Sequence, residues 1–338
     1  MLINGAMTIS QKGSVADMGN PAGPAQAATD MWRVVEVGVV ARFTSSQDTT
    51  SPAGFGYSLK CDCTTAEAAV AGAEVLLTAT RIEAQNLQHL QYGAAAAKSM
   101  TLSFWFRSPK TGVHCVGVYQ YDGNRSYVAE FTIASADTFE FFSITIPGDA
   151  SGTINNDTGI GLEIGFPLVA GSNWHASADA WASGQDYATS NQQNLMDNTA
   201  NNVYIAGVQL EVGSVATDFA HEDVGTTLIK CHRYYQSIES AVTLPWTVVC
   251  DSATSGYAFW SLPVKMRANP TMTGNAGGSD GVTVSGSNRF SSLGSLYVYT
   301  NTYHDGGYIS ITLSGATAGF AGRWTASAGF YLRWSAEL

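Results

Sequence analysis

Between residues 31 and 219, apolar and polar side chains alternate in short runs that are separated by turn residues. The clearest run is residues 98–109, KSMTLSFWFRSP. Because successive side chains of a strand point to opposite faces, the two faces of this strand differ. The apolar face carries Leu102, Phe104 and Phe106, and the opposite face carries Ser103, Trp105 and Arg107. Short strands at spacings of about 8–12 residues are typical of a sandwich or jelly roll.

We therefore predict an all-β chain whose main part is a jelly-roll β-sandwich of about nine strands. A hairpin turn is indicated at residues 122–125, DGNR, between the runs GVHCVGVYQY and SYVAEFTI. Strands do not alternate with long helical patterns, so a parallel sheet is not expected.

The pattern divides the chain into four parts. Residues 1–30 are rich in Ala, Gly, Pro and Gln, which predicts an irregular arm, either a flexible tail or an anchor that orders on a partner. Residues 31–222 hold the jelly roll, and residues 223–240 form a short helical connector. Residues 241–338 return to strands and predict a smaller C-terminal β-domain.

The connector contains the one convincing helical pattern, at residues 224–236, VGTTLIKCHRYYQ. Asp223 precedes it as a candidate N-cap. Its apolar stripe, at i, i+3, i+4 and i+7, is Leu228, Cys231, His232 and Tyr235.

Residues 170–198 break the strand pattern with a long polar excursion that contains Trp174, Trp181 and Tyr187. Loops of this length within a compact domain are usually functional.

The charge composition limits the classes of partner that the chain can bind. Only 13% of the residues are charged, the net charge is −11, and 35 residues are Gly. Between Ser126 and Ile229 there is no Lys or Arg, but there are thirteen acidic residues. Such a surface repels phosphate backbones and anionic bilayers, so neither nucleic-acid binding nor membrane insertion is expected. It would tolerate divalent cations.

The five cysteines are an odd number and lack the paired spacing of a zinc site, so we expect reduced, structural thiols. The chain has no run of about 18 apolar residues and does not begin with a basic region followed by an apolar one. We expect it to be made in a cytoplasm and to remain soluble.

Residues 201–219, NNVYIAGVQLEVGSVATDF, are the most distinctive stretch, and CHRYY follows at residues 231–235. They resemble tailed-phage and prophage virion proteins whose jelly-roll module closes on the pattern VQLE-x-GS-x-AT-x-F. In those proteins a helix ending in Cys-x-Arg-Tyr-Tyr follows. The resemblance covers roughly residues 30–236, including KSMTLSFWFRSPKTG and DGNRSYVAEFTIASADTFE. LINGAM near the start is similar to the beginning of such tail-associated proteins, and SLPVKMRANPTMT is more weakly similar to distal fibre domains.

This resemblance implies a module similar to the carbohydrate-binding jelly rolls of phage fibres and spikes. It implies location on the virion, and a role in virion architecture, host-surface adhesion or both. By analogy it implies a homotrimer that contacts other virion proteins through residues 1–30. Related modules often hold a structural calcium.

Sugars stack their C–H faces on exposed aromatic rings and bond polar side chains in the same groove. Trp105 and Arg107 share one face of their strand, and Glu130 lies on the polar face of another. If both faces line one concave sheet, these three residues form a glycan platform. The alternative is that Trp105 packs under a loop or against a neighbouring subunit.

The loop aromatics Trp174, Trp181 and Tyr187 are a second candidate glycan surface, since Tyr and Trp among Ser, Gly and Asn are typical of recognition loops. The alternative is that they pin the loop onto the sandwich.

Asp30, Asp179, Asp186 and Glu211 are candidate calcium ligands because hard cations prefer oxygen. No ligand spacing supports them, and a scattered acidic surface is the alternative. No other cofactor is expected.

No hydrolase, zincin or nucleotide-binding motif occurs, so we expect no enzyme and no catalytic residues. The C-terminal aromatic residues favour a subunit interface. They are Tyr297, Tyr299, Tyr303, Tyr308, Trp324 and Trp334. Two functions stay open, a fibre-type or spike-type host adhesin that binds a glycan and a purely structural capsid or tail decoration protein. A surface polysaccharide depolymerase is a minor alternative.

Overall fold

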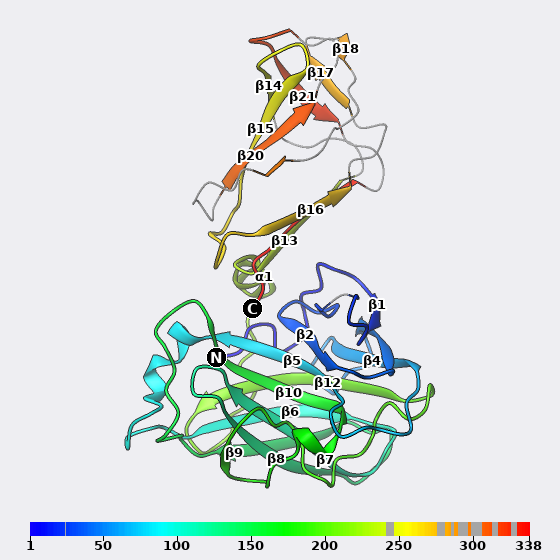
Figure 1. Ribbon diagram of the computed structural model, residues 1–338, viewed down its shortest axis with the longest axis vertical. Coiled ribbons are helices and arrows are strands. Elements are labelled where there is room, and N and C mark those ends of the chain that lie inside the picture. Colours follow the sequence, from blue (N-terminus) through cyan, green and yellow to red (C-terminus); the bar gives the residue numbers. More distant parts are fainter. Residues whose placement is uncertain are drawn as a thin grey trace. The chain divides into compact units, whose positions relative to one another are not determined.

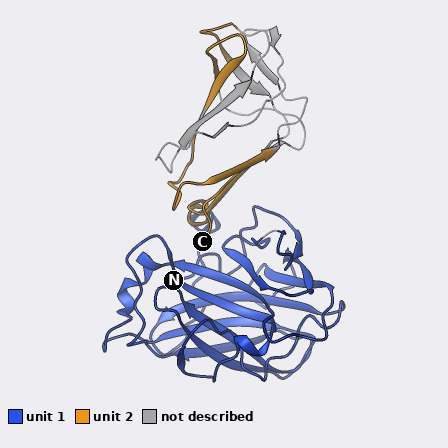
Figure 2. Ribbon diagram, viewed as in Figure 1, with its two compact units in different colours: residues 1–228, 338 blue, residues 229–337 orange. Residues whose placement is uncertain are grey.

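The computed structural model describes residues 1–23, 25–240, 247–275, 281–284, 287–289, 297–298, 306–312, 317–325 and 330–338. These residues form two compact units, shown in different colours in Figure 2. The first comprises Met1–Leu228 with Leu338, and the second comprises Ile229–Glu337.

The first unit consists of two six-stranded antiparallel sheets packed face to face (Figure 1). Sheet A has the order β1 (Val15–Met18), β3 (Arg42–Asp48), β4 (Ser58–Thr65), β12 (Asn202–Val212), β6 (Met100–Arg107) and β9 (Glu140–Ile146). Sheet B has the order β11 (Trp181–Ser183), β8 (Arg125–Ile133), β7 (Gly112–Gln120), β10 (Ile160–Ala170), β5 (Val75–Glu83) and β2 (Trp32–Val37). The predicted all-β jelly-roll sandwich is confirmed.

Between residues 31 and 219 the structure has eleven strands, two more than the predicted nine. One addition arises because the Val-rich run at residues 31–43 gives two strands in different sheets: β2 of sheet B ends at Val37 and β3 of sheet A begins at Arg42. The second addition is β11, which lies inside the excursion that was expected to be loop.

The core lies between the inner faces of the two sheets. Phe104 of β6 lies edge-on to Phe131 of β8 and Phe166 of β10, with ring centroids 5.1 and 5.0 Å apart. Because these rings come from both sheets, they fix how the sheets pack. The alternation in β6 therefore puts Phe104 inside and Trp105 outside, as the sequence predicted.

The N-terminal residues are part of this core. Met7 and Met18 are fully buried, and β1 pairs with β3. The carbonyl of Gly5 accepts a 2.9 Å hydrogen bond from the amide of Val208 in β12. The boundary expected at residue 30 is therefore not a domain boundary, and the predicted arm is wrong as a description of residues 1–23 and 25–30. The hydrophobic pattern of the sequence did not predict this packing, because the N-terminal residues are irregular apart from β1 and an isolated β-bridge.

Residues 171–198, here called the strap, fold back over the outer face of sheet B. They include the short 3-10 helix η2 (Ser172–Trp174) and β11. A second 3-10 helix, η1 (Ala84–Leu90), follows β5.

The predicted connector helix is present as α1 (Val224–His232). The side chain of Asp223 caps it, accepting from the amides of Gly225 at 2.9 Å and Thr226 at 3.2 Å. The helix ends before the predicted Gln236, because Tyr235 begins strand β13 (Tyr235–Ser240), which pairs with β22 (Phe330–Ser335). Among the described residues, no helix is long and apolar enough to cross a bilayer.

The second unit is also built of antiparallel strands. β13, β22 and β16 (Thr271–Asn275) form a three-stranded sheet. A seven-stranded sheet has the order β18 (Ser287–Arg289), β17 (Gly281–Val284), β21 (Ala321–Thr325), β14 (Thr247–Cys250), β15 (Ser255–Ser261), β20 (Gly306–Thr312) and β19 (Tyr297–Val298).

Five of the six aromatic side chains suggested for a subunit interface lie outside the described part of the chain. Tyr299 and Tyr303 lie outside the described residues, as do the side chains of Tyr297, Tyr308 and Trp324. Trp334 is buried within the second unit, with 1% of its surface exposed.

Candidate functional site

The outer face of sheet A carries an exposed aromatic pair. Trp105 of β6 lies directly opposite Phe141 of the edge strand β9, with ring centroids 5.4 Å apart. Phe141 is 48% exposed and Trp105 is half-buried. Cross-strand aromatic pairs of this kind stabilise a sheet and leave ring surface open to solvent.

A glycine extends this surface across β12. Gly207 sits at an irregularity in the pairing of β12 with β6, at φ +58°, a conformation that favours glycine. A Cβ atom there would lie 2.6 Å from the ring of Phe55 and 3.1 Å from that of Trp105. The missing side chain thus lets both rings lie against the β12 backbone.

Two more rings join Phe55. Its centroid is 5.0 Å from that of Phe219 and 5.1 Å from that of His221. Phe55, Trp105, Phe141, Phe219 and His221 are called the aromatic surface below.

Arg107 lies beside this surface but is committed to protein contacts. Its guanidinium group lies 4.7 Å from the ring centroid of Tyr204, and its Nε donates a 2.8 Å hydrogen bond to the carbonyl of Asp137. Lys60 also lies 5.9 Å from the Tyr204 ring, which is only 8% exposed. Arg107 therefore forms a fixed polar border.

Glu130 does not join Trp105, because β8 belongs to sheet B and β6 to sheet A. The expected platform of Trp105, Arg107 and Glu130 on one sheet is therefore wrong. The Glu130 carboxylate accepts hydrogen bonds from Thr189 Oγ1 at 2.5 Å and Asn191 Nδ2 at 3.0 Å, and so holds the strap.

The strap aromatics take structural positions. Tyr187 is fully buried over Gly117 and Gly165, which lie opposite each other in β7 and β10. A Cβ atom at either glycine would approach Tyr187 to 3.0 Å or less. Because its ring is covered, Tyr187 presents no face to a ligand, which corrects its assignment as a glycan-binding candidate.

A buried polar cluster anchors Tyr187. Its hydroxyl donates to Glu163, and Gln185 Nε2 donates to the same hydroxyl at 2.7 Å. Burial, with the adjacent Glu163 carboxylate, raises the pKa of Tyr187 above its usual value. The phenol therefore stays protonated and remains a donor.

The two strap tryptophans also have internal contacts. Trp174 stacks on Tyr187 at 6.3 Å, and its indole donates to the carbonyl of Ala73 at 2.9 Å. Trp181 packs on Tyr92 and donates to the carbonyl of Pro147 at 2.7 Å. These contacts match the alternative in which the aromatics pin the loop.

The four calcium candidates do not converge. Asp30 is buried and accepts from the amide of Gln11 at 3.0 Å, and Glu211 accepts from the amide of Thr217 at 3.1 Å. Asp179 accepts from Tyr127 and Asp186 from Ser126. Within the described part of the chain, no three His, Cys, Asp or Glu side chains are placed to hold a metal ion.

Desolvation raises the pKa of Asp186, and the hydrogen bond from Ser126 and the nearby His175 oppose that rise. For Glu211 desolvation also favours the neutral acid, but the hydrogen bonds from Thr217 outweigh it and lower the pKa. Glu211 thus closes the turn that follows β12.

Sequence reasoning placed Trp105 on the outer face but missed Phe55, Phe141 and Phe219. The run FEFFSITIP at residues 139–147 gave a signal for Phe141, since alternation puts it opposite the apolar Phe142. Phe55 and Phe219 lie in irregular segments, and the ring of Phe55 lies where a side chain at position 207 would otherwise be.

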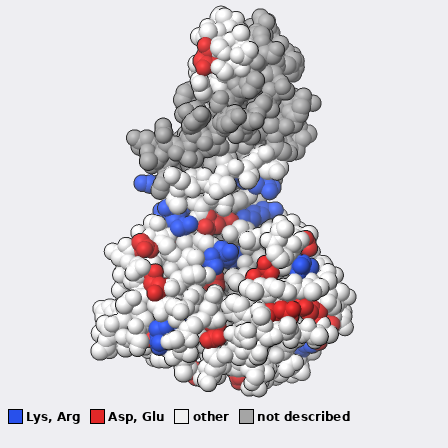
Figure 3. Space-filling view, in the orientation of Figure 1, with Lys and Arg blue, Asp and Glu red and all other residues white. Residues whose placement is uncertain are grey.

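On the face shown in Figure 3, most of the surface of the first unit is neither acidic nor basic, and the two charge types are interspersed. A large field of one sign is not visible there.

No protein-family model matches the sequence, and no curated protein matches it. Solved structures with similarity include the enzymatically active domain of a bacteriophage CBA120 tailspike protein, at 12% identity and a TM-score of 0.30 over 54% of this chain and 19% of that one. A family 11 carbohydrate-binding module of a Clostridium thermocellum cellulase has 12% identity and a TM-score of 0.29 over 55% and 89% of the two chains. A putative sugar binding protein from Bacteroides thetaiotaomicron has 12% identity and a TM-score of 0.34 over 63% and 99%. The chain thus spans about a fifth of the tailspike domain that it matches.

Proposed function

We propose that the first unit is a glycan-binding module that uses the aromatic surface of sheet A. The observation that carries this proposal is the contact between half-buried Trp105 and exposed Phe141 on the outer face of sheet A. Sugar rings present apolar C–H faces, and a solvent-exposed aromatic ring stabilises them by stacking. Arg107 and Lys60 supply charged groups at the border, although both already contact Tyr204.

Shape supports the same proposal. Because β6, β9 and β12 are neighbours or share a neighbour in sheet A, the rings of Trp105, Phe141 and Phe55 follow one another across the strands. A row of rings suits an extended saccharide chain, which can contact several rings at once.

Within this proposal, the finer role is that of a phage virion adhesin, present as a homotrimer, that binds a host surface glycan. Its support is the resemblance of residues 201–219 to virion proteins. The exposed surface of the N-terminal residues, rather than a free arm, would then contact other virion proteins. Antibody against the chain should label fibres or spikes, while uniform labelling of the capsid would favour the structural alternative.

The test of glycan binding is affinity electrophoresis of the whole chain through gels that contain β-glucan, galactan, xylan or purified bacterial surface polysaccharide. We expect retardation by at least one polymer. Trp105→Ala and Phe141→Ala should each weaken that binding roughly fivefold or more, since a stacked aromatic ring contributes on the order of 1–3 kcal/mol.

The matched control is Phe320→Ala in the second unit, because Phe320 and Phe141 are both 48% exposed. It should leave retardation unchanged. If both sheet A variants fold normally and bind every polymer as well as the unaltered chain, the aromatic surface is not the glycan site.

A further inference from the structure

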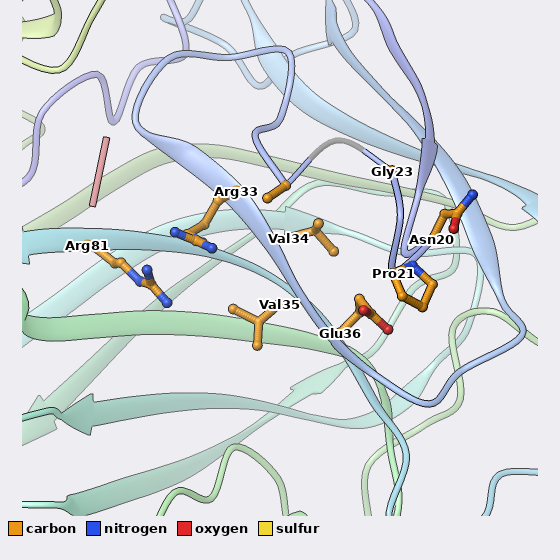
Figure 4. A pocket seen from close by; sticks show the side chains of 9 residues that line it. Asn20, Pro21, Gly23, Arg33, Val34, Val35, Glu36 and Arg81 are labelled. Carbon is orange, nitrogen blue, oxygen red and sulfur yellow. The ribbon is translucent and has the colours of Figure 1, made fainter. Parts of the chain in front are cut away.

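A small pocket lies at the edge of sheet B, between β2 and the loop that begins at Asn20. Its volume is about 210 Å³, and Figure 4 shows the side chains that line it. Two guanidinium groups lie on one side and the Glu36 carboxylate lies on the other, near Pro21 (Figure 4). None of the contacts described for the aromatic surface involves these residues.

Arg81 is a rigidly held donor in this pocket. Its Nε donates to Glu163 Oε2 and its Nη2 donates to the hydroxyl of Tyr121, both at 2.5 Å. Its guanidinium group also lies 5.1 Å from the Tyr121 ring centroid, and only 11% of the side chain is exposed. These bonds use two of its three nitrogens, so Nη1 remains for a ligand.

Glu36 is an acceptor that the protein leaves unused. Its Oε2 atom is buried and accepts no hydrogen bond from any described residue. A buried acceptor without a partner costs on the order of 1–3 kcal/mol, so a hydroxyl group that hydrogen-bonds to this carboxylate would offset part of that cost.

The charges around the pocket limit the net charge of a ligand that it can bind. Arg33 and Arg81 line the pocket with Glu36, and Glu163 is paired with Arg81. The positive groups are therefore not in excess, and the pocket offers no unopposed positive charge that would select an acidic sugar. Arg33 also donates from Nη1 to the main-chain oxygen of Leu338, which uses part of its capacity.

We propose that this pocket binds one neutral sugar residue, as a second site separate from the aromatic surface. Hydroxyl groups both donate and accept, so they can serve Glu36 and the arginines at once. Val35 and Pro21 provide apolar contact for ring carbons. The volume is below the range of about 300–1,000 Å³ of drug-sized sites, which suits a single ring. For its ligand class this inference rests on the proposed glycan binding.

The test uses saturation-transfer NMR on the whole chain with the methyl glycosides of glucose, galactose and mannose, and with glucuronate as the acidic comparison. At least one neutral glycoside should bind. The comparison is made in the Trp105→Ala chain, so that stacking on the aromatic surface does not contribute to the signal. In that chain Glu36→Ala should weaken glycoside binding tenfold or more. Asp218→Asn, which removes an exposed carboxylate outside the pocket, is the control and should leave glycoside binding unchanged.

Three results would overturn the proposal: no neutral glycoside binds, only glucuronate binds, or Glu36→Ala leaves glycoside binding by the Trp105→Ala chain unchanged. Glu36→Gln keeps the shape of the side chain and should not lower the melting temperature without sugar, because no hydrogen bond is lost. Loss of polymer binding in Trp105→Ala with intact glycoside binding would show two independent sites. Polymer binding that survives both Trp105→Ala and Phe141→Ala would refute the aromatic surface alone.

Discussion

His114 lies inside the sandwich, where only 1% of its surface is exposed. Its ring packs against Phe106 at 5.7 Å and Phe131 at 5.8 Å, and its Nε2 lies 3.0 Å from the carbonyl of Lys110. Nε2 must therefore carry a proton, since a carbonyl only accepts. Burial lowers the pKa of His114, while the carbonyl of Lys110 opposes this and the Lys110 charge adds to it.

We predict that His114 makes the first unit less stable in acid. Because its pKa is lower in the folded chain, the unfolded chain takes up a proton first as the pH falls below about 6.5. Stability from this group is thus present above that pH and is lost below it, by up to about 1.4 kcal/mol per pH unit. When denaturant unfolding is measured between pH 7.5 and 5, the free energy of unfolding should fall less steeply with falling pH for His114→Leu than for the unaltered chain.

The slope, rather than the absolute stability, is the quantity to compare, because any change at a buried site alters packing. The same substitution at exposed His89 is the control. Equal slopes for His114→Leu and the unaltered chain would contradict the prediction.

At the scale of elements, the strap and the N-terminal segment show what alternation can and cannot predict. The position of Trp105 on an outer face followed directly from its strand. The burial of Tyr187 did not, because it depends on Gly117 and Gly165, which are distant in sequence. Likewise the separation of Glu130 from Trp105 depends on which strands share a sheet, and single-strand periodicity carries no such information.

The N-terminal segment gives the element-scale prediction. Met18 of β1 is fully buried in the main core, opposite Phe43 of β3. Met18→Ala should reduce the free energy of unfolding by about 2–5 kcal/mol, the usual cost of emptying such a site. The measurement is denaturant unfolding of the whole chain followed by tryptophan fluorescence.

Val40→Ala serves as control, since Val40 is 59% exposed and should change stability by less than about 0.5 kcal/mol. A detachable arm would instead tolerate Met18→Ala without loss. The two substitutions therefore distinguish an integral strand from an appendage.

At the scale of the whole molecule, the chain consists of two units that each have their own strands and buried residues. In the first unit, both sheets and the strap lie within residues 1–212. The division between the units falls within α1, after Leu228, and the second half of the predicted connector is β13.

We predict that residues 1–222 fold without the second unit. Circular dichroism should show one cooperative thermal transition, because the main hydrophobic cluster is complete within this segment. If the trimer proposed from the resemblance is made by the second unit, sedimentation equilibrium should give a monomer for residues 1–222 and a trimer for the full chain. Aggregation or a non-cooperative melt of residues 1–222 would contradict independent folding.

The position of β12 has a consequence for synthesis on the ribosome. This strand is the last of the first unit along the chain, yet it lies between β4 and β6 in the middle of sheet A. Until residue 212 has emerged, β1, β3 and β4 cannot join β6 and β9, and both halves present open strand edges. These edges must be kept from pairing wrongly until β12 has been synthesised. The emergence of β12 from the ribosome then joins the two halves of sheet A.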